Sequence, residues 1–220
     1  MPTDPDTSRL LHRVCHDLRT PVRGIRAHAE LLLKDSANGP PADFEQRLEF
    51  IVNSARQMDL FVEGLSSYIN ALEINPDSFL STRLDVLLRG ALAKLANTLR
   101  ESGAEVTHGE LPRLHGNPDW LIQLFVELIR NAMEHRGEAT PKVHIGAKQE
   151  DDLWTICVRD NGPGMEAGDL ERAFLPFERL HGRGPGLGLA TSRAIVAAHR
   201  GRIWAESSGE GLTVCFTLPA

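Results

Sequence analysis

The residues best suited to chemistry lie in three short stretches of the C-terminal part of the chain. In ELIRNAMEHR, Glu127 and Asn131 stand four residues apart, so on a helix they share one face and can reach one ligand. In RDNGPGM, Asp160 can accept a hydrogen bond from an exocyclic amine such as that of adenine, while Gly162 and Gly164 permit a tight turn and the close approach of a flat ring. Taken alone, each stretch also has a purely structural explanation: ELIRNAMEHR as a helix with a solvated face, and RDNGPGM as a turn.

The third stretch is glycine-rich and opens a predicted helix. In GRGPGLGLA, Gly184, Gly186 and Gly188 stand at alternate positions, with Leu187 between the last two. The backbone N–H groups of such a loop, together with the positive N-terminus of a helix, form an anion site that suits phosphate groups. A glycine repeat alone is a weak signal. The order of all three stretches is far more specific than any one of them.

A fourth stretch, VCHDLRTPVRG, lies near the start of the chain within a predicted long helix. At about 100° per residue, His16 lies roughly 160° from the apolar stripe of that helix and so faces outward. Thr20 follows one turn later on nearly the same side, and Asp17 flanks His16. Pro21 cannot donate a main-chain hydrogen bond, which costs on the order of 3 kcal/mol inside a helix, so we expect a kink beside His16.

The elements that position these residues follow from hydrophobic periodicity. Residues 8–73 contain helical patterns only, and the second of two helices has apolar residues alternating at spacings of four and three, a heptad seam. A turn rich in Asn, Gly and Pro separates the helices, with Asp43 as the expected N-cap of the second. We expect an antiparallel helical hairpin that pairs with a second copy into a four-helix bundle, making a homodimer.

Residues 76–220 mix helical and strand periods. Strands are predicted within 79–85, 104–108, 142–148, 153–160, 201–207 and 212–218, and helices over about 85–101, 118–135 and 187–200. A short polar turn joins 142–148 to 153–160, which predicts a hairpin in an antiparallel or mixed sheet. The predicted fold class is therefore α + α/β. A helical hairpin over 1–75 precedes a two-layer α/β sandwich over 76–220, and Pro76 ends the last long helix.

The order of these features resembles the Bergerat-type ATP-binding domain shared by sensor histidine kinases, type II topoisomerases, heat-shock-90 chaperones and MutL mismatch-repair proteins. The stretch HDLRTP resembles the histidine box of the sensor histidine kinases, and FERLHGR and RGRIW are similar to kinase modules attached to bacterial phytochromes. The resemblance covers nearly the whole chain. It implies a kinase that transfers phosphate from Mg-ATP to His16 and then to an aspartate of a response regulator receiver domain.

The resemblance also implies a role for each matching residue. His16 is the phosphate acceptor, Asp17 stabilises its charge, and Thr20 orients water when the receiver is dephosphorylated. Asn131 and Glu127 match the box that holds Mg²⁺. The implied ATP-binding residues are Glu127, Asn131, His135, Asp160, Gly162, Gly164, Phe177, Arg183, Gly184, Gly186, Leu187 and Gly188. Phe177 belongs to the aromatic stretch FLPFERL.

The chain departs from the family pattern at two points. Only residues 178–183 separate Phe177 from Gly184, a short lid over the ATP site. Glu134 is acidic where several such kinases carry a lysine, and either His135 or Arg183 could supply the missing positive charge. Two other classes therefore stay open: a histidine phosphotransfer or docking protein with a vestigial ATP domain, and an ATPase switch that never phosphorylates His16.

The totals exclude several other functions. A formal net charge of −6 argues against nucleic acid as the main partner, because phosphate backbones need a basic face. No apolar run is long enough to span a membrane. Three scattered cysteines predict neither a disulfide framework nor a metal site, and we expect a cytoplasmic location. The sensor is expected in an upstream domain or a separate protein.

Overall fold

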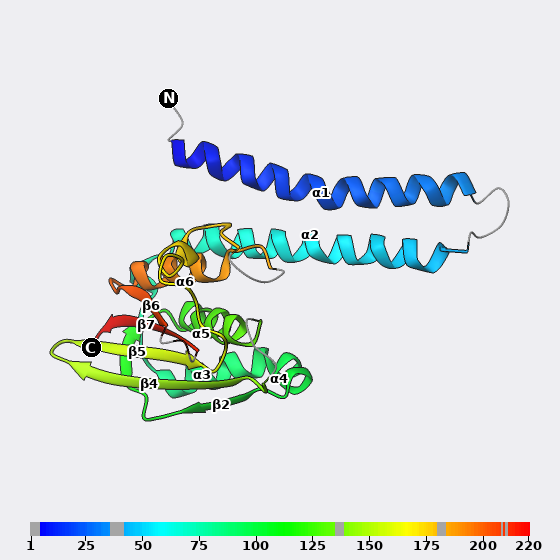
Figure 1. Cartoon of the computed structure of the whole chain (residues 1–220). Coiled ribbons are helices and arrows are strands. Elements are labelled where there is room, and N and C mark those ends of the chain that lie inside the picture. Colours follow the sequence, from blue (N-terminus) through cyan, green and yellow to red (C-terminus); the bar gives the residue numbers. More distant parts are fainter. Residues whose placement is uncertain (1–4, 36–41, 135–138, 180–183, 208, 210) are drawn as a thin grey trace. The chain divides into compact units, whose positions relative to one another are not determined.

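The computed structural model describes residues 5–35, 42–134, 139–179, 184–207, 209 and 211–220, and only the backbone over 5–11. The chain forms two compact units that divide after Leu65 (Figure 1). This division precedes the predicted boundary at Pro76 because Ala71 and Ile74 pack into the hydrophobic core of the second unit.

The first unit is the predicted helical hairpin. Helix α1 spans Pro5–Asp35 and helix α2 spans Phe44–Leu72. The ring of His28 lies 4.2 Å from that of Phe50 across the hairpin. Arg47 joins the two ends of the turn, since its guanidinium contacts Asp35 at 2.8 Å and Asp43 at 2.7 Å.

Asp43 and Pro21 take the places in the hairpin that the sequence predicts for them, before the second helix and inside the first. The main-chain N–H of Arg47 donates to the carbonyl oxygen of Asp43, as expected where Asp43 precedes the first helical turn. Pro21 lies inside α1, which continues to Asp35. The axis of α1 changes direction near the middle of the helix (Figure 1).

The second unit is built on a five-stranded mixed sheet with the order β2-β4-β5-β7-β6. Only β2 and β4 are parallel, and the other neighbours are antiparallel. The sheet is therefore mixed, one of the two predicted topologies, and the predicted β4–β5 hairpin is confirmed. Its strands are β2 Glu105–His108, β4 Lys142–Glu150, β5 Leu153–Asp160, β6 Ile203–Ser207 and β7 Leu212–Pro219.

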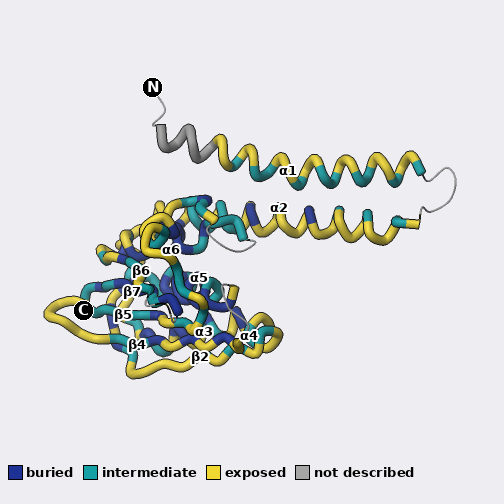
Figure 2. Tube along the Cα trace, viewed as in Figure 1, coloured by how far each residue is buried: buried dark blue, intermediate teal, exposed yellow. Residues whose placement is uncertain are grey.

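Helices cover one face of this sheet and enclose the core (Figures 1 and 2). Alternation along β5 points Ile156 and Val158 into that core, where Phe125 and Phe216 meet edge to face at 6.4 Å. The helices are α3 Leu84–Lys94, α4 Ala96–Ser102, α5 Pro118–Glu134 and α6 Gly188–Ala198, with single 3₁₀ turns η2 Pro76–Ser78 and η3 Arg172–Phe174.

Two elements differ from the sequence-based expectation. The helix predicted over about 85–101 is divided at Leu95 into α3 and α4. Strand β3, Arg113–Gly116, was not predicted; it pairs with β1, Leu80–Arg83, in a separate two-stranded sheet. The burial of β3 does alternate, but its sequence RLHG contains no β-branched residue to indicate a strand.

The cysteine prediction was wrong. Cys157 on β5 and Cys215 on β7 form a disulfide, with their Cα atoms 4.1 Å apart. They are direct cross-strand partners although 58 residues separate them in the sequence. That pairing depends on strand register, which cysteine spacing alone does not reveal. Cys15 is free and exposed.

Candidate active site

Asp160 stands at the C-terminal end of β5, where the strand leaves the sheet. Its Oδ1 accepts hydrogen bonds from the main-chain N–H groups of Gly162 at 2.8 Å and Leu212 at 3.0 Å. Among the described residues, Oδ2 of Asp160 has no hydrogen-bond partner. Two backbone donors therefore fix the orientation of the carboxylate, which presents one oxygen as an acceptor for a ligand amine.

The turn after Asp160 needs glycine for a physical reason. Gly164 has a φ of 76°, in the left-handed region, and a Cβ there would lie 2.4 Å from Oγ of Ser207. The same hydroxyl oxygen accepts a hydrogen bond from the N–H of Met165 at 2.9 Å. The RDNGPGM turn is thus pinned against the end of β6 and held close to Asp160.

The C-terminal half of helix α5 contains the predicted metal-binding pair. Glu127 is 8% exposed and Asn131 is half-buried one turn later. The Gln123 side-chain amide donates to one carboxylate oxygen of Glu127, and Arg130 lies 3.6 Å from the other. A Cβ on Gly188 would lie 3.0 Å from Oε2 of Glu127, so this carboxylate lies against the first turn of α6.

The glycine-rich loop before α6 folds onto the aromatic stretch that precedes it. The N–H of Phe177 donates to the carbonyl oxygen of Gly186 at 2.8 Å, and Phe177 itself is 5% exposed. Gly186 has a φ of 71°, and a Cβ there would lie 2.6 Å from the carbonyl oxygen of Glu178. Leu187 is buried at the N-cap of α6 and anchors the loop to the core.

Glu134 also lies beside this loop, because a Cβ on Gly184 would be 3.8 Å from its Oε2. Although the residue has an exposed surface, partial burial of its carboxyl group raises the pKa. The Arg130 guanidinium opposes that increase in pKa, and the Glu127 carboxylate adds to it. His135 and Arg183, predicted to compensate for this acidic residue, lie outside the described residues.

His16 projects from α1 into solvent, as the helical pattern predicts, with its side chain 80% exposed. Its Nδ1 lies 3.2 Å from Oδ1 of Asp17. The carboxylate only accepts, so the neutral ring carries its proton on Nδ1 and its lone pair on Nε2. The Thr20 hydroxyl lies one turn further on, 3.4 Å from the main-chain oxygen of His16.

Sequence reasoning missed three residues that organise this site. Leu212 contributes only its N–H, Ser207 holds the RDNGPGM turn, and Gln123 orients Glu127. Gln123 was open to prediction, since it stands one turn before Glu127 on the same helix face. The other two depend on the end of β6 and the start of β7 lying beside the end of β5, which no local pattern indicates.

This fold and site define a phosphotransferase core of two domains, and family comparisons agree. Residues 6–68 match the His Kinase A (phospho-acceptor) domain. Residues 116–220 match the histidine kinase-, DNA gyrase B-, and HSP90-like ATPase family. The chain belongs to the sensor histidine kinases.

Individual relatives agree with this family. Cyanobacterial phytochrome A of Nostoc sp. is 34% identical over 99% of this chain, which spans only 29% of that relative. The catalytic domain of the histidine kinase ThkA is 26% identical, with a TM-score of 0.58 over 64% of this chain and 95% of that one. ThkA in complex with the response regulator protein TrrA matches 98% of this chain and 64% of its own, with a TM-score of 0.74; at 21% identity this likeness concerns the fold.

Across the part of the chain that the structure describes, no helix is both long and apolar enough to cross a bilayer.

Proposed function

We propose that this chain is the kinase core of a two-component signalling protein. It transfers the γ-phosphoryl group of ATP to His16 and then to an aspartate of a response regulator receiver domain. One observation carries the proposal. His16 is exposed to solvent and its ring is oriented by the Asp17 carboxylate, and the same chain contains Asp160, whose carboxylate can accept a hydrogen bond from the adenine amine beside the RDNGPGM turn. Neither feature alone specifies phosphotransfer.

The residues of α1 support the first step. With the proton on Nδ1 held by Asp17, the lone pair of Nε2 attacks the γ-phosphorus of ATP. The N–P bond forms as the bond from phosphorus to the bridging oxygen breaks, and ADP leaves with that electron pair. The ring then carries a positive charge, which the adjacent Asp17 carboxylate stabilises.

The second unit would bind the ATP. Asp160 Oδ2 accepts the adenine amine, and the N–H groups at the start of α6 face the phosphates. Glu127 and Asn131 fit Mg²⁺ because carboxylate and amide oxygens are the ligands that this ion prefers, and both stand on one helix face near Gly188. When bound, Mg²⁺ neutralises charge on the phosphates.

The hairpin supports a homodimer as part of this function. Five large apolar residues of the α2 heptad seam remain more than a third exposed within one copy: Phe44, Leu48, Val62, Ile69 and Leu72. A second hairpin would remove this apolar surface from water, at roughly 25 cal/mol for each Å² buried. Sedimentation of the intact chain should give the dimer mass, and Leu48→Lys with Val62→Lys should give the monomer.

The surface around His16 fits an acidic receiver as partner. Arg19 and Arg23 are exposed on α1 near His16, which suits the carboxylates around a receiver aspartate. Thr20 lies one turn from His16, where its hydroxyl would orient water for hydrolysis of the receiver phosphate. Thr20→Ala should therefore spare autophosphorylation and slow receiver dephosphorylation; equal loss of both would show that this role is wrong.

The decisive test is incubation with γ-labelled ATP and Mg²⁺. We expect acid-labile, base-stable label on the wild type and on His12→Gln, a matched exposed histidine one turn earlier, and none on His16→Gln. ATP binding without label would contradict kinase activity and favour an ATPase switch. Absence of ATP binding would favour a phosphotransfer or docking protein.

A further inference from the structure

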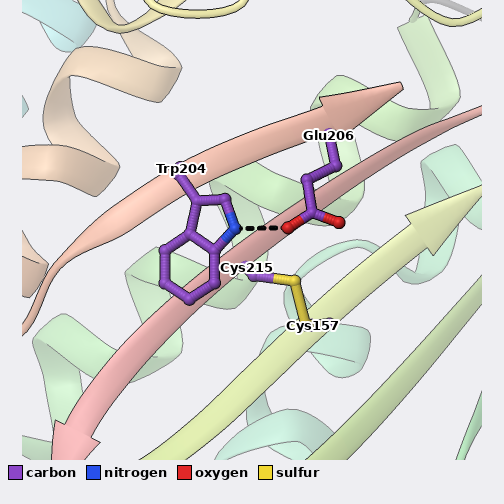
Figure 3. The surroundings of a disulfide bond; sticks show 4 residues. All are labelled: Cys157, Trp204, Glu206 and Cys215. Carbon is purple, nitrogen blue, oxygen red and sulfur yellow. Dashed lines mark hydrogen bonds between the residues drawn. A yellow bond between two sulfur atoms is a disulfide. The ribbon is translucent and has the colours of Figure 1, made fainter. Parts of the chain in front are cut away.

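The Cys157–Cys215 disulfide lies on the face of the sheet opposite the helices. Alternation places Ile156 and Val158 in the core, so Cys157 between them points to the other face. Cys215 is only 3% exposed, whereas Cys157 is half-buried. Trp204, the β6 register partner of Cys215, lies beside the disulfide, and its indole N–H donates to Glu206 at 2.7 Å (Figure 3). A small reagent therefore reaches the sulfur of Cys157 more easily than that of Cys215.

Strands β5 and β7, which the disulfide joins, also hold Asp160, the carboxylate proposed to accept the adenine amine. Three residues beyond Cys157, β5 ends at Asp160, and three residues before Cys215, β7 begins at Leu212. The Leu212 N–H to Asp160 Oδ1 hydrogen bond joins these two strand ends. At about 3.3 Å per residue, the disulfide lies only about 10 Å along the strands from this hydrogen bond. Any change in β5–β7 spacing at the disulfide is therefore felt at Asp160.

The disulfide also sets that spacing. Directly opposed residues of unbridged antiparallel strands have Cα separations of about 4.5 Å or about 5.5 Å. Cys157 and Cys215 are held at 4.1 Å. Once the covalent bond is removed, the main-chain pairing persists, but nothing holds the strands this close. The Leu212 N–H, which orients the Asp160 carboxylate, then moves with the start of β7.

We propose that Cys157 and Cys215 form a reversible thiol modification site that tunes the nucleotide affinity of the Asp160 site, an inference that rests on the ATP binding proposed above. In the disulfide form Asp160 is oriented for the ligand, and in the dithiol form it binds nucleotide more weakly. The co-reactant is a low-molecular-weight thiol or disulfide.

The chemistry balances as two thiol–disulfide exchanges. During reduction, a thiolate attacks the sulfur of Cys157, a mixed disulfide forms, and Cys215 leaves as thiolate and takes up a proton. A second small thiol releases Cys157, so two electrons pass to the protein and one small-molecule disulfide forms. Oxidation reverses both steps: Cys157 attacks the small disulfide and Cys215 then displaces the remaining small thiol.

The test uses the wild-type chain in both redox states. Alkylation with mass spectrometry should leave Cys157 and Cys215 unlabelled after equilibration with oxidised glutathione, with Cys15 carrying either the label or glutathione, and should add three labels after dithiothreitol. Titration calorimetry with ATP should give a Kd at least threefold higher for the dithiol form, and re-oxidation should restore the original value. Cys157→Ser should match the reduced wild type in either buffer, and Cys15→Ser should respond like the wild type.

Each contrary result has a distinct meaning. Equal ATP affinity in the two verified redox states would overturn the coupling and leave a structural crosslink. Failure of the disulfide to re-form would overturn its reversibility. Absence of ATP binding in both states would overturn the proposed function and, with it, the coupling. Thermal unfolding of both states shows whether the dithiol form is still folded at the temperature of the calorimetry, which separates a local change at Asp160 from general loss of structure.

Discussion

The substitution Asp160→Asn separates the two roles that this carboxylate combines. In the wild type, Oδ1 accepts two main-chain hydrogen bonds, and Oδ2, which has no partner among the residues that the structure describes, is available to a ligand amine. The asparagine amide has one acceptor oxygen and one donor nitrogen. The N–H groups of Gly162 and Leu212 select the oxygen, so the NH₂ group is directed at the ligand. An acceptor for adenine is thereby replaced by a donor.

The magnitude follows from hydrogen-bond energetics. A hydrogen bond to a charged group contributes about 1.5–3 kcal/mol, and leaving two donors face to face adds a desolvation cost of about 1–3 kcal/mol. Together these terms come to about 2.5–6 kcal/mol, so ATP affinity should fall by roughly 60-fold to 20,000-fold. The fold loses less, since both main-chain donors keep a partner and only the charge assistance is removed. Asp160→Ala is the matched control, because it removes both acceptor oxygens and should also destabilise the unit.

The assay is titration calorimetry with ATP and with inosine triphosphate, alongside thermal unfolding. Inosine triphosphate carries a carbonyl where ATP carries the amine, so the Asp160→Asn variant should bind it better relative to ATP than the wild type does. Unchanged ATP affinity, or an equal fall for both nucleotides in Asp160→Asn, would refute the assignment of Oδ2 as the adenine acceptor.

Three further predictions follow from the same unit. Gly186→Ala should destabilise the second unit by about 2–4 kcal/mol in denaturant unfolding, because residue 186 has a φ of 71° and the new Cβ would lie 2.6 Å from a main-chain oxygen. Gly184→Ala, whose Cβ would have its nearest contact at 3.8 Å, should be nearly neutral. Equal effects of the two substitutions would contradict this explanation. Burial lowers the pKa of His199 from its ordinary 6.5, so below pH 6.5 the unfolded state binds a proton that the folded state does not. As pH falls below 6.5, the free energy of unfolding should therefore decrease by up to about 1.4 kcal/mol per pH unit. The His199→Gln variant should show a shallower dependence on pH. Glu134→Gln should tighten ATP binding about threefold to tenfold at neutral pH, because it removes a negative charge beside the glycine-rich loop that precedes α6. The raised pKa of Glu134 predicts that the wild type also binds ATP more tightly as pH falls. Weaker binding by the variant would instead indicate that Glu134 holds Mg²⁺.

Much of the architecture was predictable because its signals are local. The heptad seam of α2 predicts one side of a helical hairpin, and the outward angle of His16 follows from counting residues along α1. The expected strands were all found, and each contains at least one β-branched residue. Strand β3 contains none, and the break at Leu95 interrupts an otherwise continuous helical pattern.

The active-site prediction was similarly divided. Asp160, Glu127 and Asn131 could be proposed as site residues because their motifs are contiguous, and their roles stay predictions. The orientation of Asp160 could not be, because its partner Leu212 is 52 residues away on a strand whose register is a tertiary property. The disulfide was mispredicted for the same reason: two strand cysteines become partners only when β5 and β7 align.

The sequence by itself determined the class of this protein: a helical hairpin with an outward histidine, followed by an α/β unit whose motifs occur in the order of an ATP site. That information lies in periodicity and spacing, which the covalent chain carries whatever it packs against. Only the tertiary structure decided that two main-chain N–H groups hold one oxygen of Asp160, that Gly186 has no room for a methyl group, and that Cys157 faces Cys215. Each of these depends on how distant segments align, because contacts across a sheet are set by register and packing rather than by neighbours along the chain.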